Sequence, residues 1–84
     1  MEHDVKVLPE YYNDSEQGIK DFTIRRDDRI PKFAVGDTLR KREFIDGRFT
    51  GRIHRRTIKY IYRGIIGLKK GYAILGFEPI VRQV

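Results

Sequence analysis

Cysteine is absent from this 84-residue sequence, and histidine occurs only twice. Without cysteine the chain can form neither a disulfide nor a thiolate metal site. The two histidines, His3 and His54, lie far apart in the sequence, and a solvated or hydrogen-bonded imidazole explains each better than a metal ligand does. We therefore expect no metal site and no cofactor.

Long apolar stretches are also missing. No run of residues approaches the length that a membrane-spanning helix needs, and the segment that begins at Met1 lacks the basic and apolar regions of a signal peptide. We therefore expect no contact with a membrane and a location in the cytoplasm. A chain of 84 residues suffices for one modest core, which predicts a single domain over residues 1–84.

Basic residues outnumber acidic ones, and the net charge is +6. The excess is uneven, because residues 1–17 contain five acids and one base, whereas the remainder contains seventeen bases and seven acids. A domain that is basic over most of its length attracts polyanions, and nucleic acid is the commonest of these in a cell. Charge alone leaves open a surface that is rich in lysine and arginine but has no such partner.

The residue pattern predicts one helix followed and preceded by strands. Pro9 suits the first turn of a helix and Gly18 suits the position after its end, so we expect a helix at about residues 9–17. Asp46-Gly47 is a strong hairpin signal, and the apolar phase of the strand that follows changes after Ile53, which predicts a bulge or bend. The alternating, β-branched segments expected as strands are residues 3–8, 21–26, 38–45, 52–62 and 71–77.

A short chain with these elements belongs to the mainly β (α+β) class. Small strand-rich chains tend to close into barrels, because closure removes exposed strand edges. We therefore predict a small β-barrel of five to six strands with one N-terminal α-helix. The residues expected inside it are Phe22, Ile24, Leu39, Ile74 and Leu75.

Residues 18–25, with the sequence Gly-Ile-Lys-Asp-Phe-Thr-Ile-Arg, resemble the signature Gly-x-Lys-x-x-(Glu/Thr)-x-Arg of ASCH (activating signal cointegrator homology) domains. Residues 33–37, Phe-Ala-Val-Gly-Asp, are similar to the second mark of that family, and residues 3–12 and 71–75 resemble a short bacterial and phage group of ASCH proteins without an established function. The resemblance covers nearly the whole chain. It implies a PUA-like β-barrel with a cleft between the helix and the motif strand, and the binding of RNA or a nucleotide.

The resemblance places Lys20, Thr23 and Arg25 in that cleft. Independently of it, Thr23 and Arg25 share one face of a strand, and two cations beside a hydroxyl suit a phosphate or a carbonyl group. The alternative is a solvated strand face in which Arg25 pairs with Asp21 or Asp27.

Two other functions remain open at this point. Thr23 stands where many members of the short group have glutamate, and Lys20 and Thr23 match the lysine and threonine of acetylcytidine amidohydrolases, small ASCH enzymes that also use a glutamate. This resemblance implies Lys20 and Thr23 as catalytic residues if the chain is an enzyme, and only elimination points to Glu43 or Glu78 as the third group. The remaining alternative is an adaptor that binds another protein.

A basic tract runs from Arg40 to Arg63, with nine lysines and arginines against two acids. Phe44, Phe49, Tyr60 and Tyr62 are interleaved with these bases. Basic strands can follow a phosphate backbone while exposed aromatic rings stack on bases. The alternative is a solvated surface with the aromatic rings in the core. The further residues predicted to contact RNA or a nucleotide are Arg26, Arg29, Arg55 and Arg56.

Overall fold

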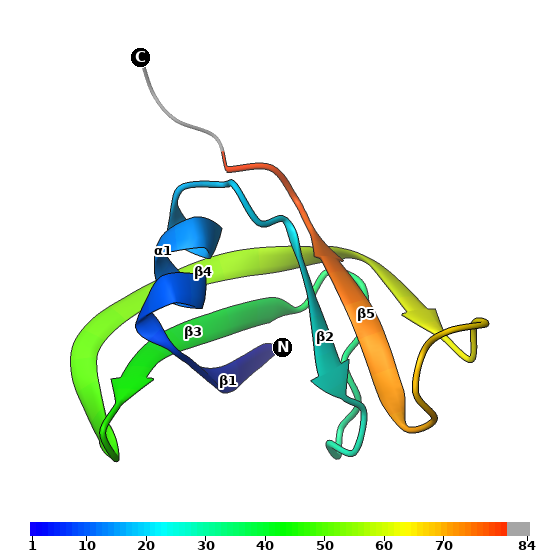
Figure 1. Ribbon diagram of the computed structural model, residues 1–84. Coiled ribbons are helices and arrows are strands. Elements are labelled where there is room, and N and C mark those ends of the chain that lie inside the picture. The colour runs from blue at the N-terminus through cyan, green and yellow to red at the C-terminus, as the bar shows by residue number, and fades with distance from the viewer. Residues whose placement is uncertain (81–84) are drawn as a thin grey trace.

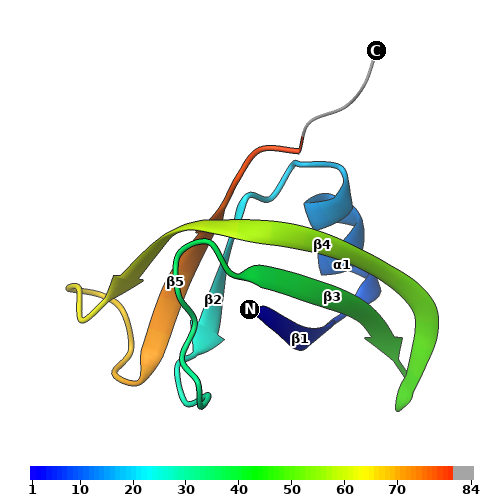
Figure 2. The ribbon, with the colours of Figure 1, turned by 180° about the vertical axis from the view of Figure 1, so that it is seen from behind.

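Five strands and one helix form in the computed structural model, which describes residues 1–80 (Figure 1). The strands make one mixed sheet in the order β1-β3-β4-β5-β2, in which only β1 and β3 are parallel. Helix α1 lies against β3, on one side of the β3–β4 part of the sheet (Figures 1 and 2). The elements are β1 (Glu2–Val7), α1 (Pro9–Glu16), β2 (Phe22–Arg26), β3 (Thr38–Ile45), β4 (Arg48–Arg63) and β5 (Tyr72–Phe77).

The fold is mainly β, as predicted, but the predicted barrel is wrong because the sheet is not closed. Within residues 1–80, β1 and β2 are the two edges, and no backbone hydrogen bond joins them. Side chains span the gap instead: the Arg25 guanidinium donates to the carbonyl oxygen of Lys6 at 3.1 Å, and that of Arg29 donates to the carbonyl oxygen of Asp4 at 2.6 Å. We call this gap between β1 and β2 the seam.

Strand β4 belongs to both halves of the sheet. Its residues 48–57 pair with β3, and residues 58–63 pair with β5. The predicted hairpin turn is confirmed, since Asp46 and Gly47 both have positive φ angles, 52° and 75°, between the paired residues Ile45 and Arg48. The predicted irregularity is also present, as a register shift between Ile58 and Tyr60.

The core confirms part of the predicted set. Leu39 and Leu75 are fully buried, and Ile74 is half-buried. Phe22 and Ile24 were predicted inside but are 48% and 54% exposed, so that part of the prediction is wrong. Strand β2 alternates as predicted, but its other face is the buried one. Thr23 pairs with Leu75 and lies on the buried face, whereas Phe22 and Ile24 lie on the exposed face. The buried cluster consists of Val5, Phe33, Leu39, Ile58, Ala73, Leu75 and Phe77.

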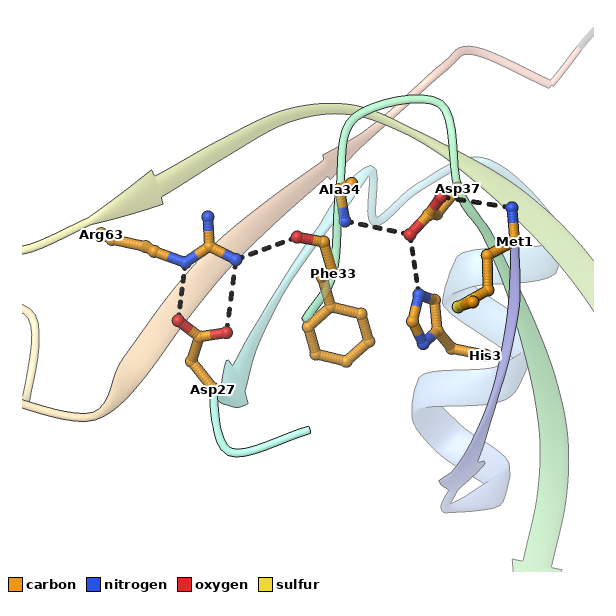
Figure 3. Close-up of polar contacts among 7 residues, drawn as sticks. All are labelled: Met1, His3, Asp27, Phe33, Ala34, Asp37 and Arg63. Atoms are coloured by element: carbon orange, nitrogen blue, oxygen red, sulfur yellow. Dashed lines mark hydrogen bonds and ion pairs between the residues drawn. The ribbon is translucent and has the colours of Figure 1, made fainter. Parts of the chain in front are cut away.

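Asp37 fastens the loop before β3 to the first strand (Figure 3). One carboxylate oxygen accepts hydrogen bonds from the Ala34 amide at 3.0 Å and from His3 Nε2 at 2.8 Å, and the other accepts from the Met1 amino group at 3.3 Å. The hydrogen bond from His3 is the main cause that lowers the pKa of Asp37. These contacts explain the aspartate of the Gly-Asp pair that precedes β3.

Replacing Asp37 with alanine should lower the free energy of unfolding by about 1–3 kcal/mol at pH 7, because it leaves buried donors without an acceptor. A lowered carboxyl pKa contributes stability above the unfolded-state pKa of about 4 and loses it as the pH falls through the folded-state value. The loss caused by the substitution should therefore shrink toward pH 3. Urea unfolding at both pH values measures it, and Asp28→Ala, at an exposed pair with Arg26, is the control that should change little.

Candidate functional site

A tight chain reversal after α1 brings the motif residues to the seam. Gly18 has a φ of 77°, which favours glycine, and the amides of Ile19 and Lys20 both donate to the carbonyl oxygen of Asp14, at 2.9 and 3.1 Å. The chain then enters β2 at Phe22. Lys20 consequently lies where the helix, β1 and β2 approach one another.

A cleft of about 400 Å³ opens at this place. Its walls come from the end of β1, the first turn of α1, the motif strand β2 and one residue of β3. Every titratable residue that lines it is basic or a tyrosine, and no aspartate or glutamate contributes. The lining residues are Lys6, Val7, Leu8, Tyr11, Lys20, Phe22, Thr23, Ile24, Arg25 and Lys41.

Lys20, Thr23 and Arg25, the residues predicted for the site, all line the cleft. The Lys20 ammonium lies 4.7 Å from the centre of the Tyr11 ring and 5.8 Å from that of Phe22. Arg25 is half-buried, and burial, followed by the charge of Arg29, lowers its guanidinium pKa. Arg25 pairs with neither Asp21 nor Asp27, because those carboxylates hold Arg56 and Arg63.

Lys41 is the lining residue that the sequence reasoning missed. It is 3% exposed, its ammonium donates to Ser15 Oγ at 2.8 Å, and it lies 4.1 Å from the centre of the Phe77 ring. Burial lowers the Lys41 pKa to about 7, helped by the charges of Arg56, Arg25 and Lys20. A signal for it existed, because Lys41 lies two residues after Leu39 and therefore on the same, inward face of β3.

Ser15 joins Lys41 to a half-buried histidine. His54 Nε2 lies 3.0 Å from Ser15 Oγ, and the His54 ring packs edge-on against Tyr12 at 4.6 Å. Burial, and next the charge of Lys41, lower the His54 pKa to about 4, so the imidazole is neutral at pH 7. Both histidines are thus engaged within the protein, since His3 bonds Asp37.

Arg56, which was predicted to contact RNA, is buried and does not line the cleft, so its position does not support that prediction. Its guanidinium donates to the carbonyl oxygens of Ser15, Lys20 and Glu78 and to the Asp21 carboxylate, at 2.8–3.4 Å. These four partners surround the segment that links α1 to β2 and the end of β5. Arg56 therefore supports the wall of the cleft from behind.

The other predicted arginines lie outside the cleft lining. Arg26 is exposed and 4.0 Å from the Asp28 carboxylate, Arg29 bonds the carbonyl oxygen of Asp4 across the seam, and Arg55 pairs with Glu2 at 2.9 Å. Within the basic tract, Arg40, Arg52 and Arg63 also pair with carboxylates. Phe49, Tyr60 and Tyr62 are exposed rather than in the core, so their rings are available for stacking. RNA binding by the tract stays a prediction.

Neither carboxylate considered for an enzyme lines the cleft. Glu43 is buried near the β3–β4 turn, where Thr50 and Arg52 donate to it at 2.7 and 3.1 Å. Glu78 is exposed, and its carbonyl oxygen accepts from Arg56. Among residues 1–80, no three histidine or acidic side chains are grouped as metal ligands, and α1, with 8 residues, is far too short to span a membrane.

The sequence matches the model of a known family. A family described as a domain of unknown function, DUF3850, matches residues 2–77. The matched region contains all five strands, α1 and every residue of the cleft lining. No curated protein matches the chain.

Proposed function

This chain belongs to the DUF3850 family, and we propose that it is a binding module that holds RNA or a nucleotide in the cleft between α1 and β2. The observation that carries the proposal is the lining, which combines cationic and aromatic side chains and contains no carboxylate. Such a cleft attracts an anion and disfavours a cation. We further propose that it acts in the cytoplasm, where RNA and nucleotides are available.

The side chains suit the parts of a nucleotide. Arg25 offers a planar fork and Lys20 a compact charge to a phosphate group. Tyr11 and Phe22, the aromatic side chains of the lining, offer rings on which a base can stack. The Thr23 hydroxyl lies on the same strand face as Arg25 and can donate to or accept from a base edge or a phosphate oxygen.

The resemblance to ASCH domains supports the same proposal. It implies a cleft between the first helix and the motif strand, and Lys20, Thr23 and Arg25 share such a cleft here. We therefore propose a PUA-like relationship in which the seam stands where a closed barrel would have its last strand pairing. The amidohydrolase alternative lacks a carboxylate in the lining, so we do not propose catalysis.

Lys20→Met and Arg25→Met should each weaken the binding of adenosine 5′-monophosphate or a short uridine oligonucleotide about tenfold, because each removes a charge-assisted hydrogen bond. Titration calorimetry or fluorescence anisotropy measures this, and binding should weaken steeply with salt. Arg55→Gln is the matched control for adenosine 5′-monophosphate, since Arg55 lies outside the lining. Absence of binding at low salt would refute the proposal and leave a protein partner as the better explanation.

A further inference from the structure

We propose that Lys41 receives a terminal phosphate monoester at the floor of the cleft and takes up a proton as that phosphate binds. This inference rests on the proposed function and narrows the ligand to a mononucleotide or a nucleic acid end that carries a monoester. It assigns the recognition of the phosphate to a residue of β3, which lies outside the Gly-x-Lys motif.

The geometry places a buried amine at the cleft without a compensating charge. Lys41 lines the cleft, yet within residues 1–80 no carboxylate forms an ion pair with it. Its one hydrogen-bond partner in the described part of the chain is the neutral hydroxyl of Ser15. An ammonium group has three N–H donors; Ser15 accepts from one and the Phe77 ring lies 4.1 Å away, so at least one remains for a ligand.

The groups around Lys41 favour its neutral form until an anion arrives. Lys20, Arg25 and Arg56 oppose its charge, and Asp21 favours it but is exposed and paired with Arg56. The other neighbours of Lys41 carry no charge: they are Ser15 of α1, the neutral His54 of β4 and the Phe77 ring of β5. With a pKa of about 7, Lys41 is mostly a neutral amine at pH 8.

A phosphate monoester is the anion that fits this floor. It carries a charge of about −2 above pH 7 and three terminal oxygens, enough to engage Arg25 and Lys41 together. An internal diester of RNA has one charge and two ester substituents, which would hold it away from a residue that is 3% exposed. The dianion offsets the repulsion from the neighbouring cations, so the amine binds a proton from solvent and becomes an ammonium.

Calorimetry at pH 8 tests this, with adenosine 5′-monophosphate titrated in buffers of different ionisation enthalpy. The phosphate is already a dianion there, because its second pKa is about 6. We expect the protein to take up about 0.9 proton per site and the affinity to fall about tenfold per pH unit above pH 7. A dinucleoside monophosphate, which has only a diester, should bind more weakly and without proton uptake.

Two variants test whether Lys41, rather than another group of the protein, takes up the proton. Lys41→Met should abolish uptake and weaken binding at least tenfold, whereas Lys20→Met should weaken binding and keep most of the uptake, because burial, Arg56 and Arg25 lower the Lys41 pKa more than Lys20 does. If Lys41→Met does not fold, Lys41→Arg gives the same test, because a guanidinium is already charged and should bind without uptake.

The outcomes distinguish the two proposals. No binding by the wild type at any pH refutes nucleotide binding itself. Binding with a flat pH dependence and no proton uptake overturns the role of Lys41 and leaves the proposed function intact. Uptake that persists in Lys41→Met or Lys41→Arg assigns the proton to another group and also overturns it.

Discussion

Replacing Arg56 with methionine should lower the free energy of unfolding by about 3 kcal/mol or more, because removing one partner from a buried ionic network leaves the others without donors. The carbonyl oxygens of Ser15, Lys20 and Glu78 would each lose the guanidinium. Methionine keeps part of the packing against Phe77, so the loss reports mainly on the hydrogen bonds. Equilibrium unfolding in urea measures it.

Arg55→Met is the matched control for this substitution. Arg55 adjoins Arg56 in β4 but points to the other side, where its side chain is 58% exposed and pairs with Glu2. Exposed ion pairs contribute about 0–1 kcal/mol, so this variant should unfold nearly like the wild type. Equal losses in the two variants would contradict the supporting role of Arg56.

Leu75→Ala should cost about 2–5 kcal/mol of unfolding free energy, because it removes a fully buried side chain and leaves a cavity beside Ile58 and Phe77. Ile24→Ala, in the neighbouring strand, should cost about 1 kcal/mol or less, because surface substitutions have small effects. Thermal or urea unfolding of both variants measures the difference. This pair also tests the phase of β2, since a larger cost at Ile24 would mean that Ile24 rather than Thr23 faces the core.

The predicted elements were close to the observed ones because their signals are local. Pro9 and Gly18 delimit α1 within one or two residues, Asp46 and Gly47 form the turn, and the third strand has the predicted bounds 38–45. The motif also brought Lys20, Thr23 and Arg25 to one cleft. Each of these features depends on residues that are near one another in the sequence.

The incorrect or missing predictions depend on contacts between distant residues. A buried arginine is acceptable at position 56 only because Ser15, Lys20, Asp21 and Glu78 supply its acceptors, and no local pattern reveals them. The inward phase of Thr23 follows from its pairing with Leu75. Closure into a barrel was expected from a general tendency, whereas the outcome depends on how β1 and β2 meet.

At the seam the sheet is held by side chains and core packing rather than by backbone pairing. Arg25 of β2 and Arg29 of the loop after it each donate a hydrogen bond to a carbonyl oxygen of β1, and every backbone ladder of the sheet lies elsewhere. Separating the two edges would cost these hydrogen bonds, each about 1 kcal/mol, and would also expose Val5, which packs in the core with Leu75.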